Sequence, residues 1–582
     1  MNDMKRKILK ILHLPEFYLI LGLALVLSIL RFGSAGVENV RLIRNGSTDE
    51  TSFPIAVGMN DGERFTVEMD WFPGILGATK LKIHPDDCAD ALFVNGQPLD
   101  VEKYPGHCDW TNGFVIPSSD LESSGFGRKA LRFELHNGGG LAGMLLSVEM
   151  ESPLGLILRV LSYLLVGALL VFIARRFHVS LLFAVIFVVG ILFRFIYVQE
   201  TTYDQRGHDV GGHLAYVQII AEQHHIPSAG ECWTCYHPPL YFAVSALPWN
   251  VAKSVNASPQ RALQWESFAF SLLSLFFGLL CLRILLRSDK MFGIAGILWS
   301  LWPSFVLTSA RIGNDQLFYL WHILCFWSSL EYLSLRKGKY LIVAAVTSGL
   351  AFMTKTTGAV SVALFVITAL LGFFPKAFHR PSRTEIAGLV IGLAVCVLCT
   401  VFLTGHEVAE NVGGLKWVDV GNRPENYLVF DLRNFLLQPY TSPFDDAMGR
   451  QYFWNYLTKT SLFGEFSLLT TGPGILFASV ISVAFLAISG FVLRGFFNLK
   501  VSRTSALCVL QGLLFLASSL FFRIRYPFSC SNDFRYIMPA LLSFVCIAAI
   551  GIESGNHPVL RVFGYVVAGV FGAASVLLLL LL

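Results

Sequence analysis

Apolar runs long enough to cross a membrane follow one another along most of the chain. A membrane-spanning helix needs about 20 mostly apolar residues, and runs near this length fill the sequence after residue 153. An earlier run at 16–33 follows a short basic stretch. We interpret it as a retained anchor rather than a signal peptide, because it is long and no small-residue cleavage site follows it. The later runs lie at 154–174, 179–198, 265–287, 291–309, 314–335, 339–355, 357–375, 385–404, 473–495, 504–522, 536–552 and 560–582.

A more polar segment at 36–152 separates the first run from the others and has the periodicity of β-strands. Residues 81–84 and 131–136 alternate apolar with polar side chains, which predicts half-buried strands. Asn95 and Gly96 follow an apolar stretch, as in a two-residue hairpin turn. We therefore predict a β-sandwich over 36–152.

Composition supports a membrane protein. Hydrophobic residues make up 54% of the 582 residues and charged residues only 14%, whereas soluble domains carry about 25% charged residues. This excludes a chain of ordinary soluble domains, a disordered protein, a collagen, a coiled coil and a small disulfide scaffold. The net charge of +4 is too small and too spread out to indicate nucleic-acid binding. The predicted fold class is a polytopic α-helical membrane protein with an extracytoplasmic β-sandwich after the first span.

Basic residues between the apolar runs set the predicted topology, because cytoplasmic loops are enriched in Lys and Arg. With the N-terminus inside, the β-sandwich lies outside. The short apolar stretch 237–252 is ambiguous. If it does not cross, the later basic clusters all fall inside, so we predict a re-entrant or interfacial segment. The chain then has about 13 spans, with its C-terminus and the long loops 199–264 and 405–472 outside.

The predicted topology also sorts the cysteines. Cys88, Cys108, Cys232, Cys235 and Cys530 lie outside, where disulfides persist. Cys88 with Cys108, and Cys232 with Cys235, are plausible pairs. The spacing Cys232-x-x-Cys235 also fits redox chemistry or zinc, but no second pair with zinc-finger spacing accompanies it.

The outside segment after the run 179–198 is rich in polar residues. Asp209, His213 and Tyr216 are spaced i, i+4 and i+7, so a helix would place them on one face. A carboxylate one turn from an imidazole is a plausible general base for a hydroxyl substrate. The alternative is a solvated juxtamembrane helix with ordinary surface polarity.

Histidines are concentrated in the same segment, but they do not predict a metal site. Only Asp209 and His213 have one-turn ligand spacing, and two ligands are not enough. No cofactor is predicted with certainty: a divalent cation is conceivable but is not supported by clear ligand spacing, and interfacial histidines are the simpler interpretation. The histidines are His208, His213, His224, His225 and His237.

Another outside turn contains Arg311, Asn314 and Asp315. Asp315 opens a membrane helix, where an ionisable residue is expensive and is a functional candidate by default. Helix capping by Asn314 or Asp315 is the alternative, and capping and function are compatible.

Two cations lie at outer ends of apolar runs. Lys355 is a lone cation there, and it fits either phosphate binding or snorkelling of its side chain toward water. Arg535 lies near Arg523 and Arg525. Three arginines outside run against the positive-inside bias, so they indicate either an anionic ligand or pairing with lipid headgroups.

Taken in order, these motifs resemble the GT-C superfamily of membrane glycosyltransferases. The nearest groups are bacterial relatives of the protein O-mannosyltransferases and the aminoarabinose transferases of lipid A. The resemblance covers about residues 179–552. The motifs that carry it are Gly207-His208-Asp209 with His213 and Tyr216, His237-Pro238-Pro239-Leu240-Tyr241-Phe242, Arg311 with Asn314-Asp315, Thr354-Lys355-Thr356-Thr357-Gly358, and Phe534-Arg535-Tyr536 with Pro539.

The resemblance implies a mechanism. Such enzymes take a sugar from a polyprenyl-phosphate carrier at the extracytoplasmic face of, in this case, a bacterial inner membrane, and pass it to a glycan, lipid or protein acceptor. The catalytic base maps onto Asp209, with Asp204 as the alternative, and a second acidic position maps onto Asp315. Cations near Lys355 and Arg535 would hold the carrier phosphate. The other residues implied in substrate binding are His213, Tyr216, His237, Arg311, Asn314 and Tyr536.

The apolar pattern and the resemblance together predict four parts of the chain. These are a cytoplasmic segment and anchor at 1–35, the β-sandwich at 36–152, an additional span at 153–178, and the transferase domain at 179–582. Family members often carry Asp-Glu at the position of Asp209-Val210, so an acidic metal-binding pair is not implied here.

The sandwich resembles jelly-roll carbohydrate-binding domains in the stretch 86–96. Two other functions fit a membrane protein of this kind. One is a transporter or flippase for lipid-linked sugars, which would need polar residues at mid-membrane. The other is a glycan receptor without catalytic activity. Most predicted spans contain few polar residues in their middle, and the polar residues gather at one end, which favours the enzyme.

Overall fold

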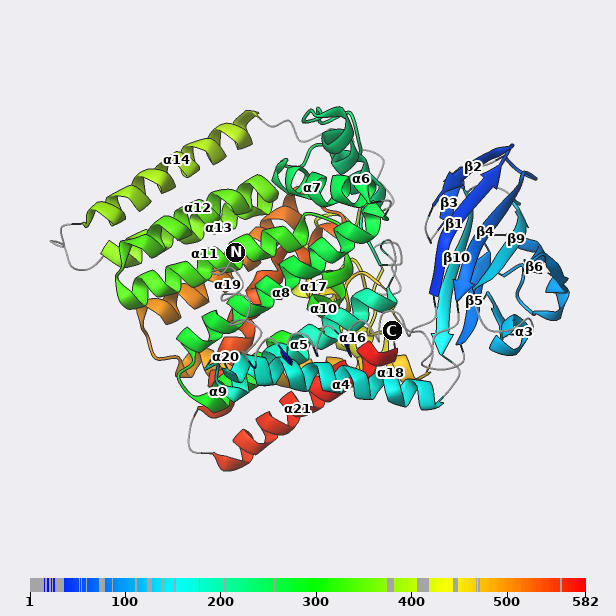
Figure 1. Cartoon of the computed structure of the whole chain (residues 1–582). Coiled ribbons are helices and arrows are strands. Elements are labelled where there is room, and N and C mark those ends of the chain that lie inside the picture. The colour runs from blue at the N-terminus through cyan, green and yellow to red at the C-terminus, as the bar shows by residue number, and fades with distance from the viewer. Residues whose placement is uncertain are drawn as a thin grey trace, which may run out of the picture. The chain divides into compact units, whose positions relative to one another are not determined.

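The structure, a computed structural model (Figure 1), describes residues 36–581 except for short gaps, and only scattered positions before residue 36. The predicted anchor at 16–33 therefore lies largely outside the described residues. Two compact units divide the chain, residues 1–184 and 185–582, and each is described by itself. The longer gaps are 73–78, 123–127, 374–380, 406–417 and 443–448, and residues 204–205 also lie outside the described part.

The first unit contains two antiparallel β-sheets and helix α4 (Pro153–Arg176). The larger sheet has six strands in the order β2-β1-β4-β9-β6-β7, and the smaller has four in the order β3-β10-β5-β8. The strands are β1 (Gly36–Arg44), β2 (Ser47–Glu50), β3 (Ile55–Gly58), β4 (Arg64–Phe72), β5 (Thr79–Pro85), β6 (Cys88–Val94), β7 (Gln97–Leu99), β8 (Phe114–Ile116), β9 (Lys129–His136) and β10 (Leu141–Met150).

Alternating side chains from both sheets make one hydrophobic core. Val67 and Trp71 of β4 are fully buried, and so are Ile83 of β5 and Met144 of β10. Along β4 every second residue is buried, which is the period-2 pattern that the sequence predicted for strands in this region. The predicted hairpin turn also forms. Asn95 and Gly96 both have positive φ, and they connect β6 to β7.

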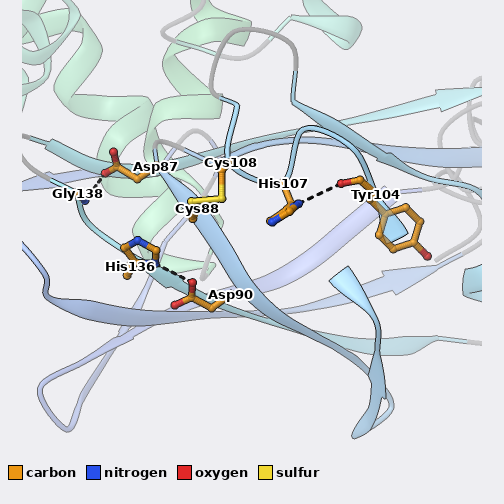
Figure 2. The surroundings of a disulfide bond; sticks show 8 residues. All are labelled: Asp87, Cys88, Asp90, Tyr104, His107, Cys108, His136 and Gly138. Carbon is orange, nitrogen blue, oxygen red and sulfur yellow. Dashed lines mark hydrogen bonds and ion pairs between the residues drawn. A yellow bond between two sulfur atoms is a disulfide. The ribbon is translucent and has the colours of Figure 1, made fainter. Parts of the chain in front are cut away.

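A disulfide joins Cys88, at the start of β6, to Cys108 (Figure 2). The backbone N–H of Ala89 donates to the carbonyl of His107 at 2.8 Å, so the loop before Cys108 is also hydrogen-bonded to the strand. On the neighbouring strand, His136 contacts the Asp90 carboxylate at 2.7 Å. The predicted pairing of the two cysteines is confirmed.

The second unit is helical. Helices α11 to α14 lie side by side, and α18 packs against both α20 and α21 (Figure 1). Its helices are α5 (Leu181–Glu200), α6 (Val210–Gln218), η2 (Ile219–Gln223), α7 (Leu240–Ser254), α8 (Pro259–Leu285), α9 (Asp289–Leu301), α10 (Pro303–Leu307), η3 (Thr308–Ala310), α11 (Asp315–Leu335), α12 (Gly338–Thr354), η4 (Thr356–Gly358), α13 (Ala359–Phe373), α14 (Arg383–Gly405), α15 (Pro424–Leu428), α16 (Leu432–Leu437), α17 (Phe453–Phe463), α18 (Gly472–Asn498), α19 (Arg503–Arg525), η7 (Ser529–Asn532), η8 (Phe534–Ala540), α20 (Leu541–Glu553) and α21 (Pro558–Leu581).

Among the described residues, eight helical segments are long and apolar enough to cross a membrane, and a bent pair of helices would make a ninth. The chain is therefore an integral membrane protein. The eight segments are Leu181–Gln199, Pro259–Leu285, Thr356–Phe373, Arg383–Val401, Gly472–Asn498, Arg503–Arg525, Ser529–Glu553 and Pro558–Leu581.

The sequence predicts about 13 spans, of which the run 16–33 lies largely outside the described residues, and two of the other predicted spans differ in the structure. The predicted span 291–309 is broken at Pro303, where α9 and the α10–η3 segment meet at an angle of 52°. Proline has no N–H to continue the helix, which explains the break. Helix α12 is apolar but has only 17 residues. Helix α7 has 15 residues, fewer than the 20 or so that a bilayer needs, which agrees with a segment that does not cross.

Candidate functional site

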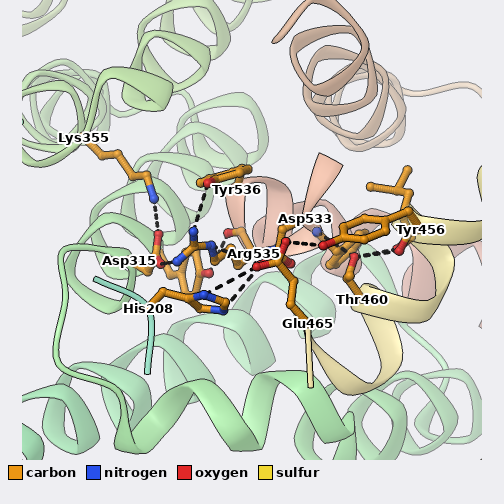
Figure 3. A network of polar contacts seen from close by, with 12 residues as sticks. His208, Asp315, Lys355, Tyr456, Thr460, Glu465, Asp533, Arg535 and Tyr536 are labelled. Carbon is orange, nitrogen blue, oxygen red and sulfur yellow. Dashed lines mark hydrogen bonds and ion pairs between the residues drawn. The ribbon is translucent and has the colours of Figure 1, made fainter. Parts of the chain in front are cut away.

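Charged side chains from distant parts of the sequence meet inside the second unit (Figure 3). Burying charges is unfavourable unless they are paired or bind something, so this cluster is the first candidate for a functional site. Most of its side chains are buried. Its members are His208 before α6, Arg311 after η3, Asp315 at the start of α11, Lys355 after α12, Glu465 after α17, and Asp533 and Arg535 at the start of η8.

Asp315 is the centre of one half of the cluster. Its carboxylate forms an ion pair with the Lys355 ammonium group and lies 4.0 Å from Nη1 of Arg535. Both cations also lie over the Tyr536 ring, at 4.7 Å for Lys355 Nζ and 4.9 Å for Arg535 Cζ. The structure thus brings together four of the residues that the sequence predicted for the site.

Arg535 is held on several sides. Its Nε lies 3.0 Å from Oδ2 of Asp533, and its Nη2 donates a hydrogen bond to the Tyr536 hydroxyl at 2.9 Å. Asp533 caps the short helix η8, because its other oxygen accepts from the backbone N–H of Arg535 at 3.0 Å. The hydroxyl of Tyr319 donates to the Arg535 carbonyl at 2.6 Å. Both the backbone and the guanidinium group are therefore fixed.

His208 links this half of the cluster to Glu465. Its ring lies between two carboxylates, with Nδ1 at 3.4 Å from Glu465 and Nε2 at 3.7 Å from Asp533 (Figure 3). Burial, and then the nearby cations, hold the pKa of His208 well below its ordinary value. The imidazole is therefore neutral at pH 7.

Glu465 is a buried carboxyl group whose charge depends on pH near neutrality. Burial, and then the Asp533 carboxylate, raise the pKa of Glu465 to about 8. The hydroxyl of Tyr456 donates to Oε1 of Glu465 at 2.5 Å. At pH 7 Glu465 is mainly protonated.

This pKa gives a prediction for stability. A carboxyl group whose pKa is higher in the folded than in the unfolded chain stabilises the fold below the unfolded value, here 4.5, and this contribution is lost as pH rises through about 8. Glu465→Gln keeps the neutral form at every pH. We expect the melting temperature of the wild type in detergent to fall between pH 6 and 9 more steeply than that of Glu465→Gln. Parallel curves for the two proteins would contradict this.

His208, Glu465 and Asp533 could also hold a metal ion. Each offers one ligand atom, and these atoms lie within 4.8 Å of one another. His208 Nε2 has no hydrogen-bond partner among the described residues, whereas Asp533 Oδ2 is already ion-paired with Arg535 Nε at 3.0 Å. Neutral imidazole and carboxylates suit Zn²⁺, and three protein ligands leave a position open. Glu465, which is mainly protonated at pH 7, would have to lose its proton to bind the ion. Short ligand spacings along the chain are absent here, because the three residues are distant in the sequence and meet only in the fold.

Arg311 faces a small pocket next to this cluster. The pocket is lined by Arg311 together with His208, His213, Asp315 and Arg535, among others. The Arg311 side chain is buried, yet its Nε and Nη2 have no hydrogen-bond partner among the described residues. Its guanidinium lies 4.8 Å from the Phe466 ring centre. A buried guanidinium with unused donors facing a pocket is suited to an anionic ligand.

The predicted helical face of Asp209, His213 and Tyr216 is only partly present. His213 and Tyr216 lie in α6 and are buried. Asp209 precedes the helix in the left-handed conformation, with φ of 53°, and its side chain is exposed. A non-helical residue does not follow the helical spacing, which is why its side chain leaves the shared face. Asp209 still interacts electrostatically with His213.

His213 interacts electrostatically with Asp209 and also faces the pocket. It lines the pocket, and its ring stacks on that of His237 with 6.0 Å between centroids. Burial lowers the pKa of His213 to about 4, so it is neutral. The hydroxyl of Tyr216 donates to the His237 carbonyl at 3.4 Å. His213, Tyr216 and His237 thus contact one another, but Asp209 itself does not line the pocket.

Two of the remaining predictions concern Asn314 and Asp204. The Asn314 amide donates to the Thr354 carbonyl at 3.4 Å, which ties the turn before α11 to the end of α12. It does not cap α11 with its side chain. Asp204 lies outside the described residues.

Several members of the cluster were not predicted from the sequence. Asp533 has a signal there, because it stands two residues before Arg535 at the start of an apolar run. Glu465 lies near the end of a long loop, and Tyr319 and Tyr456 look like ordinary helix residues. Nothing in the sequence marks these three, because their position depends on the packing of separate segments.

A family model supports the resemblance found in the sequence. Residues 236–402 match the model described as dolichyl-phosphate-mannose-protein mannosyltransferase. The matched segment contains Arg311, Asp315 and Lys355, while Asp209 lies before it. The predicted resemblance to GT-C glycosyltransferases is confirmed for this segment. Comparison with curated protein sequences gave no match.

Solved structures give weaker likenesses. ArnT from Cupriavidus metallidurans, solved bound to undecaprenyl phosphate, is 14% identical with a TM-score of 0.31, and the alignment covers 63% of this chain and 77% of that one. The arabinosyltransferase EmbB from Mycobacterium smegmatis is 10% identical with a TM-score of 0.37, covering 96% of this chain and 59% of EmbB. The chain thus matches less than two thirds of the length of EmbB. At these values neither structure assigns a role to a residue of this chain.

Proposed function

Taking the chain as a membrane glycosyltransferase of the GT-C type, as the match over 236–402 indicates, we propose that it transfers a sugar from a polyprenyl-phosphate carrier to an acceptor hydroxyl. The buried cluster is the site of the carrier phosphate. We further propose that this site faces the extracytoplasmic side of a bacterial inner membrane, because the basic loops between the spans assign the opposite side to the cytoplasm.

The charge of the cluster is the observation that carries the proposal. At pH 7 His208 is neutral and Glu465 is mainly protonated. The Asp315 and Asp533 carboxyl groups are paired with Lys355 and Arg535. Arg311 then remains as a buried positive charge with unused donors, facing the pocket. A buried, uncompensated cation is unfavourable unless an anion binds there.

The residues have distinct roles in the proposed reaction. The acceptor oxygen forms a bond to the anomeric carbon of the sugar while the bond from that carbon to the phosphate oxygen breaks. The hydroxyl proton passes to Asp209, and the electron pair of the broken bond stays on the phosphate. Arg311, together with Lys355 and Arg535, stabilises that developing negative charge. Such electrostatic stabilisation is usually a large part of catalysis.

Arg311 provides the direct test. We expect Arg311→Ala to weaken binding of a polyprenyl phosphate about 10- to 100-fold, since a hydrogen bond to a charged group contributes about 1.5–3 kcal/mol. Arg311→Lys should recover only part of the lost affinity, because an ammonium group cannot form the bidentate contact that a guanidinium forms with a phosphate. The measurement is a titration of the purified protein with undecaprenyl phosphate in detergent.

The matched control is Arg525→Ala, because Arg525 is exposed at the end of α19 and lies 5.5 Å from the Tyr526 ring. We expect its binding to match the wild type. Unchanged affinity in Arg311→Ala, or an equal loss in both variants, would reject the proposed phosphate site.

A further inference from the structure

The segment between η2 and α7 is a compact loop closed by a disulfide. Cys232 and Cys235 are bonded to each other, as the sequence predicted. The backbone N–H of Cys235 also donates to the Cys232 carbonyl at 3.2 Å, and that of His237 donates to the Thr234 carbonyl at 3.0 Å. Thr234 is fully buried, while Trp233 beside it is 53% exposed. The loop therefore presents one large aromatic side chain from a rigid base.

The loop lies directly on the first turn of α6. A Cβ atom added at Gly212 would lie 2.7 Å from Cγ2 of Thr234 and 3.2 Å from Cδ1 of Trp233. Only glycine allows so close an approach. The disulfide loop and the start of α6 are thus fixed relative to each other at the turn that follows Asp209.

Trp233 contacts the proposed catalytic base. Its indole N–H donates to Oδ1 of Asp209 at 3.0 Å. Asp209 is in the left-handed conformation and does not cap α6 with its side chain. Among the described residues, the indole provides the one hydrogen bond found for this carboxylate. One oxygen is therefore held in place, and Oδ2 remains to accept a proton.

The Trp233 side chain is half exposed, and the edge of its indole that carries the N–H lies at this carboxylate. A half-exposed aromatic ring next to a hydrogen-bonding carboxylate suits a sugar ring, which has an apolar face and hydroxyl groups at its edge. Because the base acts on the acceptor hydroxyl, a ring placed here belongs to the acceptor.

We propose that Trp233, fixed by the Cys232–Cys235 disulfide, is a positioning residue for Asp209, and that its exposed face binds a sugar ring of a glycan acceptor. This inference rests on the proposed function and names the acceptor class. The indole N–H orients the base, the ring carries the acceptor, and the disulfide maintains both.

Two substitutions separate the two roles. Trp233→Phe removes the N–H and keeps an aromatic ring. It should lower kcat about 10-fold, the effect of one hydrogen bond to a charged group, with the KM for the acceptor unchanged. Trp233→Ala should lower kcat equally and also raise the acceptor KM several-fold. Trp454→Phe is the matched control, because that indole is 42% exposed but donates to the Tyr427 carbonyl instead, and we expect wild-type values.

Reduction tests the role of the disulfide. A membrane-impermeant reductant should lower the kcat of the wild type to that of Trp233→Phe and should have no further effect on that variant, because the disulfide acts through Trp233. The second disulfide is excluded by the double variant Cys88→Ser/Cys108→Ser, which should respond to reduction as the wild type does.

Three results would overturn the inference: a wild-type kcat in Trp233→Phe, an unchanged acceptor KM in Trp233→Ala, or an equal effect of reduction on Trp233→Phe and the wild type. If these occur while Asp209→Asn is inactive, only this inference fails and the proposed function stands. If Asp209→Asn remains active, the base assignment fails and this inference fails with it.

Discussion

Asp209→Asn is expected to lower the rate of sugar transfer about 10²- to 10⁴-fold, the usual contribution of a general base. The amide has nearly the shape of the carboxylate, and its oxygen can still accept the Trp233 N–H. It cannot take the acceptor proton. Since the side chain is exposed and has no role in capping α6, folding should be unaffected. Transfer from a labelled polyprenyl-phosphate sugar gives the rate, and the melting temperature checks the fold.

Asp204 is the matched control for this experiment. It lies five positions earlier in the sequence and is the alternative base implied by the family resemblance. We expect Asp204→Asn to retain transfer activity. The reverse result, an inactive Asp204→Asn beside an active Asp209→Asn, would move the base to Asp204 and contradict the assignment.

Asp315→Ala is expected to lower the free energy of unfolding by about 3–5 kcal/mol, which is the effect of removing one partner from a buried ion pair. The side chains of Lys355 and Asp315 are only 8% and 18% exposed, and Arg535 Nη1 lies 4.0 Å from the same carboxylate. Removing Asp315 leaves the Lys355 charge buried without its partner. Chemical denaturation in detergent measures the change, and sugar transfer should be lost as well.

A double variant shows whether the loss of stability comes from leaving the buried Lys355 charge without a partner. Asp315→Ala/Lys355→Met should be more stable than Asp315→Ala by at least about 1 kcal/mol, because contacting residues are not additive. Asp289→Ala serves as the surface control. Its pair with Arg283 has side chains 75% and 44% exposed, so a loss of about 0–1 kcal/mol is expected. Equal losses in Asp315→Ala and Asp289→Ala would show that the buried pair is not stabilising.

The patterns that predicted the fold correctly are local ones. The alternation predicted at 131–136, which lies in β9, and the Asn95–Gly96 turn depend on neighbouring residues, and both appear in the structure. The number of spans was less predictable. Whether a run such as 291–309 forms one straight helix depends on Pro303. The mean hydropathy of a stretch of sequence does not reveal such a bend.

The candidate site could be predicted only in part, for a similar reason. Asp315, Lys355 and Arg535 stood out because charges are rare at the ends of membrane helices, and the structure places them together. Glu465 carries no such signal. It joins the site because the end of α17 packs against η8, which is a property of the tertiary fold. The displacement of Asp209 from the face of α6 likewise depends on one backbone dihedral angle.

The single unpaired charge of Arg311 has a consequence for turnover. In the proposed reaction the donor is a phosphodiester with one negative charge, whereas the product carrier is a phosphomonoester with about 1.5 to 2 negative charges at pH 7. One spare cation neutralises the donor but not the product. The spent carrier is therefore held with a charge mismatch next to Asp315 and Asp533, which favours its departure into the bilayer and frees the site for the next donor.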